Sequence, residues 1–210
     1  MAFVITVAQQ KGGAGKTTLA ANLAAAWAAT RKVALLDIDP QRSLSRWHEL
    51  RTNNARAVSK IHLSELAGWR LAAELDRLRT SHDVVIIDSP PQIDTDARLA
   101  IRGADFVLVP IQPSLPDLWA AEGTLKLAKA EKRVCRVVLN RAPASGGLLA
   151  RVLVQIEKTE TPRLASMLGN RVGFATAFAL GLGVTELAPK SVASKELVAL
   201  LAEIGTNSRS

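Results

Sequence analysis

Apolar residues in this chain occur in short runs that alternate with longer stretches of helical periodicity. The runs are rich in β-branched residues and have the length of buried strands. They predict strands over residues 3–8, 33–37, 84–88, 105–111 and 134–139, with weaker candidates at 58–62 and 164–168. Strands that alternate with helices in this way are typical of a parallel sheet that is covered on both faces.

The stretches between these runs predict helices over 19–30, 65–79 and 117–131. A spacing of i, i+3, i+4 and i+7 near the end of the chain predicts an amphipathic helix with an apolar face of Leu197, Leu200, Leu201 and Ile204. No repeat or long linker divides the chain. We therefore expect one α/β domain over residues 1–210, a doubly wound, mainly parallel sheet with helices on both faces and a ligand at the carboxyl ends of the strands.

A glycine-rich turn connects the first predicted strand to the first predicted helix. It reads Lys11-Gly12-Gly13-Ala14-Gly15-Lys16-Thr17-Thr18. Glycines let backbone N–H groups approach phosphate oxygens without interference from a Cβ atom, and the helix N-terminus adds the positive end of its dipole. In such a P-loop, Lys16 reaches the β- and γ-phosphates and the Thr17 hydroxyl binds Mg²⁺. The turn therefore predicts a nucleotide site.

Carboxylates end two other predicted strands, and a nucleoside triphosphatase needs carboxylates for Mg²⁺ and for the attacking water. Asp37 and Asp39 follow one apolar run, and Asp88 follows another. Because strand side chains alternate, we expect Asp37 and Asp39 to point to the same side, toward one phosphate-bound metal. A lone aspartate after a strand is usually a cap or turn residue. Three of them in this order behind a P-loop indicate a triphosphatase.

Charge and cysteine content narrow the class of protein. Lys and Arg number 27 against 19 Asp and Glu, which gives a net charge of +8. This excess favours an anionic partner such as DNA, RNA or an acidic membrane, although solubility alone also explains a basic surface. No apolar run approaches the ~20 residues of a membrane span, and the first strand leaves no room for a signal peptide, so we expect a cytoplasmic protein. The single cysteine, Cys135, lies in a predicted buried strand.

The P-loop departs from the ordinary form, because Gln10 stands where a glycine is usual and Lys11 opens the motif. In this it resembles the deviant Walker A motif, KGGxGKT[ST], of the ParA/MinD family of ATPases. The segments that contain Asp37 and Asp88 resemble the DxDPQ (switch I) and DxPP (Walker B) elements of the same family. The resemblance extends over most of the chain and becomes thin after residue 141.

This resemblance implies a P-loop ATPase that binds ATP with Mg²⁺ and closes into a homodimer around both nucleotides. Lys11 would cross the interface to touch the nucleotide of the other subunit, and Lys16 would act in its own subunit. Asp39 would position or activate the attacking water, and Asp37 would support the site and the Mg²⁺ shell. Asp88 would hold Mg²⁺ through a water, beside the Thr17 hydroxyl.

Two further segments match the family. The strand at 134–139 continues into Asn140-Arg141, which resembles a strand end that contacts adenine, and an amide can both donate to and accept from an adenine edge. A strand-ending Asn is equally a generic turn residue. The segment from Val109 to Ser114 also resembles the family pattern, and the sequence assigns it no chemistry.

Members of this family differ in what the ATP-bound dimer binds. ParA proteins bind nonspecific DNA and are stimulated by a ParB-like partner, whereas MinD-like proteins bind membrane through a basic amphipathic helix. The closing helix here lacks the cationic rim of a membrane anchor, so we expect no stable membrane association. We expect a weak, partner-stimulated ATPase that segregates or positions plasmid or chromosomal DNA and associates with the nucleoid when ATP is bound. Candidate DNA contacts are Arg163, Arg171, Lys190 and Lys195.

Other functions stay open at this point. The same ATPase cycle also suits a protein cargo, such as a chemoreceptor cluster or a microcompartment, with an activator bound to that cargo. A metabolic enzyme of the wider P-loop group would turn over a small substrate, and a carrier of an iron–sulfur cluster would need more than one cysteine. A nucleotide-binding scaffold would bind ATP without releasing phosphate.

Overall fold

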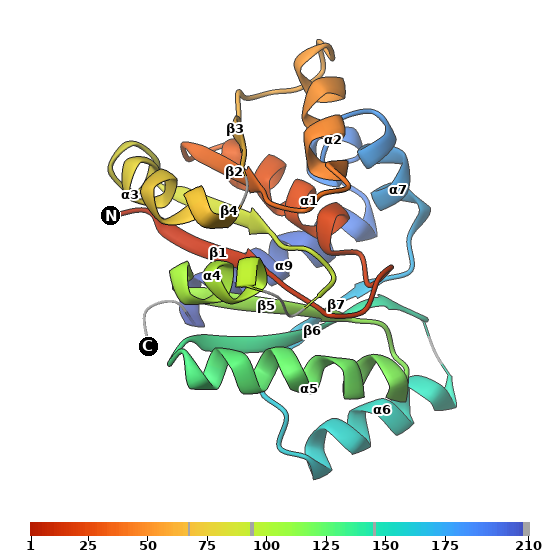
Figure 1. Cartoon of the computed structure of the whole chain (residues 1–210). Coiled ribbons are helices and arrows are strands. Elements are labelled where there is room, and N and C mark those ends of the chain that lie inside the picture. Colours follow the sequence, from red (N-terminus) through yellow and green to blue (C-terminus); the bar gives the residue numbers. More distant parts are fainter. Residues whose placement is uncertain (67, 93–94, 145, 208–210) are drawn as a thin grey trace.

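The computed structural model describes residues 1–66, 68–92, 95–144 and 146–207 (Figure 1). In this part of the chain, seven strands form one sheet in the order β3-β2-β4-β1-β5-β6-β7, and every strand pair is parallel. The strands are β1 (Phe3–Val7), β2 (Val33–Asp37), β3 (His62–Glu65), β4 (Val84–Asp88), β5 (Phe106–Ile111), β6 (Val134–Ala142) and β7 (Arg163–Gly169). The predicted fold class is confirmed.

Helices cover both faces of the sheet (Figure 1). One face carries α1 (Lys16–Ala28), α2 (Ser43–Thr52), α7 (Val172–Ala179), α8 (Val184–Leu187) and α9 (Val192–Asn207). The other face carries α3 (Leu71–Ser81), α4 (Thr95–Gly103), α5 (Leu115–Ala130) and α6 (Gly147–Lys158). The sheet is therefore doubly wound, with an apolar core on each side.

The central strands are mostly apolar because both of their faces are buried, and Thr6 is the one polar residue inside β1. In β1, Ile5 and Val7 pack in the core beneath α1 and α9, whereas Val4 packs in the core beneath α3 and α4. Cys135 in β6 is buried as predicted, and burial raises the pKa of its thiol to about 12. Burial on both faces leaves only the strand ends for polar chemistry.

The clearest difference from the sequence-based prediction is the position of β3. The sequence predicts a strand over 58–62, which is the segment just before β3. Backbone carbonyls in that segment bind side chains of α2, whereas in a strand they would pair with a neighbouring strand. Arg51 donates to the Ser59 carbonyl at 3.0 Å, and His48 Nε2 lies 2.7 Å from the Ile61 carbonyl oxygen. With these contacts from the preceding helix, the strand begins only at His62, later in the chain than predicted.

The helix expected at 65–79 is also shifted, because β3 extends to Glu65. A 3₁₀ turn, η1 (Gly68–Arg70), precedes α3. The helices α2, α4, α6, α7 and α8 were not predicted from periodicity. Helix α2 shows why, since Leu44 and Trp47 are its only large apolar side chains that are buried.

Helix α9 docks on the sheet through the apolar face that the sequence predicts. Leu197, Leu200 and Ile204 are fully buried, and Leu201 packs against them partly exposed. These side chains belong to the core beneath α1. Among the described residues, none of the helices combines the length and the apolar character that crossing a bilayer requires.

Buried polar contacts join helix α2 to α8 and to the turn before α8. Arg51 and Glu186 form a bidentate ion pair at 2.7 Å, with side-chain exposures of 3% and 6%. Trp47 Nε1 donates to the Leu182 carbonyl at 3.3 Å. Gly181 has a φ of +69°, and a Cβ atom there would collide with the backbone of Arg51. This turn therefore needs glycine for both conformation and space.

Replacing Gly181 by Ala should lower the free energy of unfolding by about 2–4 kcal/mol, because the side chain meets backbone and the left-handed conformation disfavours it. Gly205→Ala is the matched control, because an added Cβ in α9 meets nothing within 4 Å. That variant should be neutral or more stable by about 1 kcal/mol. Urea unfolding measures both values, and equal stability of the two variants would contradict the packing at Gly181.

Candidate nucleotide-binding site

The glycine-rich turn leads from β1 into α1 at the carboxyl edge of the sheet (Figure 1). Gly13 and Gly15 have φ angles of 79° and 89°, in the left-handed region that favours glycine. Helix α1 begins at Lys16, earlier than the sequence predicts, and its N-cap Gly15 has no side chain to bond the first N–H groups. These N–H groups and the positive end of the helix dipole are available to an anion.

A cavity of about 300 Å³ opens over this turn. Gly12, Gly13 and Gly15 to Thr18 form one wall. An added Cβ at Gly12 or Gly13 would meet nothing within 4 Å, so the backbone there faces open space. The other lining residues are Asp39, Gln41, Ser43, Pro91, Arg141 and Phe178. The cavity thus joins the turn to the β2–α2 connection, as a phosphate chain with a bound cation would require.

Lys16 lies almost buried at the bottom of this cavity, with 7% of the residue exposed. Burial lowers the pKa of its ammonium group, and the nearby carboxylates of Asp88 and Asp39 offset part of this effect. A buried ammonium beside an open anion site can neutralise phosphate charge at close range.

Asp88 ends β4 and is fully buried beside Thr17. Burial raises the pKa of its carboxyl to about 7, and the Thr17 hydroxyl and the Lys16 ammonium offset only part of this shift. Among the described residues, neither carboxylate oxygen makes a well-formed hydrogen bond. Such an orphaned carboxylate fits a cation shell that arrives with the ligand.

No group of three His, Cys, Asp or Glu side chains in the described part of the chain could hold a metal ion by itself. Mg²⁺ commonly takes one or two protein oxygens and completes its shell with water and substrate phosphates. The Thr17 hydroxyl and Asp88 therefore fit Mg²⁺ that is bound together with a nucleotide.

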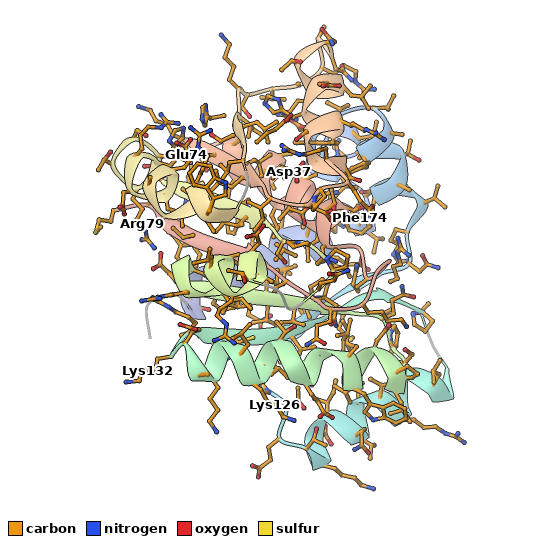
Figure 2. All side chains as sticks on the ribbon, in the orientation of Figure 1. Asp37, Glu74, Arg79, Lys126, Lys132 and Phe174 are labelled. Atoms are coloured by element: carbon orange, nitrogen blue, oxygen red, sulfur yellow. The ribbon has the colours of Figure 1, made fainter. Side chains whose placement is uncertain are left out.

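Asp37, labelled in Figure 2, holds the start of α2 through hydrogen bonds. Its Oδ2 accepts hydrogen bonds from the Ser45 amide at 2.9 Å and from Ser45 Oγ at 2.7 Å, and its Oδ1 accepts from the Asp39 amide at 3.2 Å. Burial raises the pKa of Asp37, and the Ser45 hydrogen bonds partly offset that effect. Both oxygens are engaged by protein donors, and Asp37 does not line the cavity.

Asp39 lies closer to the expected chemistry. Strand β2 ends at Asp37, so the alternation that was expected to orient Asp37 and Asp39 alike does not reach Asp39, and that expectation is wrong. Asp39 is 8% exposed and lines the cavity opposite the turn. Its Oδ1 accepts from the Gln41 amide at 2.9 Å.

A second cavity of about 300 Å³ adjoins the first and shares Gly15, Thr18 and Arg141 with it. Its walls include Leu19 and Asn22 of α1 and Phe174 of α7. Figure 2 labels Phe174, which lies on the helix beside α1. An aromatic and aliphatic lining next to a phosphate site suits a nucleoside base.

Arg141 lines both cavities and Asn140 lines the second one, and their contact with a nucleotide stays a prediction. The Asn140 side chain donates to the Ala14 carbonyl at 2.9 Å and accepts from the Arg141 amide at 3.0 Å. Its amide nitrogen would lie 2.5 Å from a Cβ at Gly15. Asn140 therefore braces the turn, a contact that motif spacing does not reveal. Arg141 donates to the Gly13 carbonyl at 3.4 Å.

Lys11 stands at the start of the turn with its side chain 46% exposed. Its Nζ lies 2.7 Å from Asp117 Oδ1 in the same subunit. The contact of Lys11 with a second subunit stays a prediction. The sequence analysis did not identify Asp117, although the Ser114-x-x-Asp117 spacing is the signature of a helix start, and Ser114 Oγ indeed accepts from the Asp117 amide at 3.2 Å.

The four basic residues proposed for DNA binding do not form one cluster. Arg163 begins β7, whereas Arg171 follows its other end and pairs with Glu196 at 2.8 Å. Lys195 precedes Glu196 on α9, and Lys190 lies just before that helix. Three of the residues thus share the nucleotide edge of the sheet, and Arg163 lies at the opposite edge.

Asp88→Asn should stabilise the nucleotide-free protein more at pH 8 than at pH 5. Between about pH 4 and pH 7 the folded chain keeps a proton on Asp88 that the unfolded chain has released, so wild-type stability falls as pH rises through this window. The Asn side chain stays neutral. Urea unfolding without Mg²⁺ measures the difference in free energy of unfolding between the variant and wild type at each pH. Asp76→Asn, at an exposed position of α3, is the control. An equal stability difference between Asp88→Asn and wild type at both pH values would contradict a protonated Asp88.

Residues 5–184 match the profile of the CobQ/CobB/MinD/ParA nucleotide binding domain. The maintenance of carboxysome distribution protein A of Halothiobacillus neapolitanus is 29% identical over 97% of this chain and 96% of that protein. The chromosome partitioning protein ParA of Myxococcus xanthus is 30% identical over 59% of this chain and 56% of its own length. Among solved structures, an ATP complex of Cyanothece McdA matches with a TM-score of 0.80 and 20% identity, over 97% of this chain and 96% of that chain.

These matches agree with the fold and with the two adjoining cavities. The family profile begins in β1 and ends in α8, so it includes the glycine-rich turn, all three aspartates and the Asn140 brace. This chain is a member of the CobQ/CobB/MinD/ParA family of nucleotide-binding proteins.

Proposed function

We propose that this protein is a ParA-like ATPase that positions a large cargo through an ATP-controlled cycle of dimerisation. The observation that carries the proposal is the uncapped N-terminus of α1 behind the glycine turn, beside buried Lys16 and the orphaned carboxylate of Asp88. An anion site with a buried cation and a free carboxylate suits a phosphate chain with its metal. Membership of the family supports nucleotide binding at this place.

Each side chain of the site has a role in this proposal. The N–H groups of the turn and Lys16 bind the β- and γ-phosphates, and the base occupies the cavity beside Phe174. Thr17 and, through a water, Asp88 hold Mg²⁺, which supplies charge neutralisation at the phosphates. Asp39 orients the attacking water. Asp37 acts indirectly, because it holds the start of α2 and the Asp39 backbone.

The nucleotide state would control assembly. With ATP, two copies close around both nucleotides and Lys11 reaches the nucleotide of the other subunit. The dimer binds nonspecific DNA and associates with the nucleoid, and hydrolysis, stimulated by a ParB-like or other cargo-bound activator, releases it. The net charge of +8 supports binding of the dimer to a polyanion such as DNA.

A protein assembly is the cargo that we propose first. The relative named for carboxysome distribution matches nearly the whole of this chain, so no large part of either protein lies outside the comparison. Partition of plasmid or chromosomal DNA is the second candidate, supported by a ParA relative that matches 59% of the chain. A MinD-like membrane role fits less well, because the leucine side chains of α9 pack in the core and do not form an exposed face that could bind a membrane.

Asp39→Ala should keep the fold and ATP binding and lower phosphate release by about 100-fold, because an unpositioned water attacks slowly. Asp37→Ala should instead lower the free energy of unfolding by about 1–3 kcal/mol, because the Ser45 donors at the start of α2 become unpaired. Phosphate release and urea unfolding of both variants separate the two roles. Normal hydrolysis by the Asp39 variant would contradict its assignment.

Binding to arbitrary duplex DNA should require ATP and fall steeply with salt. A dimer that neutralises about four phosphates should lose about 100-fold in affinity between ~50 and ~200 mM salt through counterion release. Cosedimentation with plasmid DNA in ATP, in ADP and in a nonhydrolysable analogue measures this. Lys16→Ala, which lacks the buried ammonium, should fail to cosediment with DNA in any of the three nucleotides. DNA binding that ignores nucleotide and salt would contradict the proposed cycle.

A further inference from the structure

Residues 109–117 comprise the end of β5, the connection after it and the start of α5. This segment contacts the start of the P-loop at several points. Gln9 Nε2 donates to the Pro110 carbonyl at 3.5 Å, and Gln112 Nε2 donates to the Gly13 carbonyl at 3.1 Å. Backbone and side-chain groups of this segment therefore hold the loop on the side where Lys11 lies.

The strongest of these contacts is an ion pair. Lys11 Nζ lies 2.7 Å from Asp117 Oδ1 and 3.1 Å from Oδ2. The Asp117 side chain is 2% exposed, whereas the Lys11 side chain is 46% exposed. A buried carboxylate and a solvent-accessible ammonium form an asymmetric pair, in which the lysine has open space to move into and the aspartate does not.

The position of Asp117 does not depend on Lys11. Ser114 Oγ accepts a hydrogen bond from the Asp117 amide at 3.2 Å and fixes the first turn of α5. The Asp117 carbonyl accepts from Gln9 at 3.5 Å. The carboxylate therefore stays in place when Lys11 moves, and it then lacks its cation. A buried carboxylate that loses its cation is strongly disfavoured.

We propose that Asp117 is the positioning residue for Lys11 and that it holds this lysine within its own subunit until the triphosphate of a second copy replaces it. This inference rests on the proposed ATP dimer. Each subunit must give up one Lys11–Asp117 pair as the dimer closes, so Asp117 opposes closure. Only a ligand with enough negative charge at the Lys11 position offsets this loss. Asp117 thereby sets how much ATP the dimer requires.

Asp117→Asn tests the assignment, because the amide has the size of the carboxylate and keeps the backbone hydrogen bond to Ser114. The variant should dimerise at an ATP concentration about threefold to tenfold lower than wild type, since closure no longer leaves a buried charge unpaired. Sedimentation velocity across an ATP titration gives the midpoint. Asp117→Glu, which retains the charge, should keep a midpoint close to that of wild type.

The effect must also depend on Lys11. In a Lys11→Ala background, Asp117→Asn should leave the ATP response unchanged, because the pair is already absent. A wild-type midpoint in Asp117→Asn, or an equal shift in the Lys11→Ala background, would overturn the assignment. An equal shift in Asp117→Glu would show a packing effect and would overturn it too.

The contact itself is measurable without a dimer. In nucleotide-free wild type, Lys11 should be acetylated at least fivefold more slowly than Lys126, which projects from α5 with its side chain 80% exposed (Figure 2). Mass spectrometry should show Lys11 labelling rise several-fold in Asp117→Asn, with Lys126 unchanged. Equal labelling of the two lysines in wild type would overturn the proposal.

These measurements distinguish failure of the proposed ATP-dependent dimer from failure of the role of Asp117. Wild-type protein that stays monomeric at saturating ATP would contradict the proposed function, and the role of Asp117 with it. Wild-type protein that dimerises in ATP, together with an unchanged Asp117→Asn midpoint, would remove only the role of Asp117.

Discussion

The structure depends on one unpaired feature, the N-terminus of α1. Gly15 caps this helix without a side chain, and the first turn of the helix holds no acidic residue. Lys16 adds a buried positive charge at the same point, and burial disfavours that charge unless an anion is present. The fold thus creates an anion site that a phosphate chain satisfies. The cavity above the turn and the orphaned carboxylate of Asp88 complete it.

Parallel topology brings the rest of the chain to this point. The carboxyl ends of β1, β2 and β4 are neighbours in register, with Val7 and Asp37 both paired to Asp88. Three braces then hold the P-loop and its surroundings: Asp37 on the start of α2, Asn140 on Ala14, and the β5–α5 connection on Lys11 and Gly13. These contacts come from three different strands or the segments that follow them, β2, β6 and β5.

The sheet and the P-loop were predictable because their signals are local: buried strands are apolar runs, and the turn is eight consecutive residues. The prediction of β3 was wrong where Arg51 and His48, on the preceding helix α2, contact the backbone of that segment. Alternation along β2 could not orient Asp39, because the strand ends two residues earlier. Lys11 and Asp117 are 106 residues apart, and no local pattern links them. The contacts that Asn140 and Asp117 make with the P-loop join residues far apart in the sequence, and hydrophobic periodicity does not predict such contacts.

The central claim is that a triphosphate binds at the N-terminus of α1, with its base beside Phe174. A crystal structure of the full chain grown with Mg²⁺ and a nonhydrolysable ATP analogue tests it most directly. We expect phosphates against the Gly12–Thr18 backbone and Lys16, the metal next to Thr17 and Asp88, and the base in the adjoining cavity. A nucleotide bound elsewhere, or a turn that holds no phosphate at saturating ligand, would contradict it.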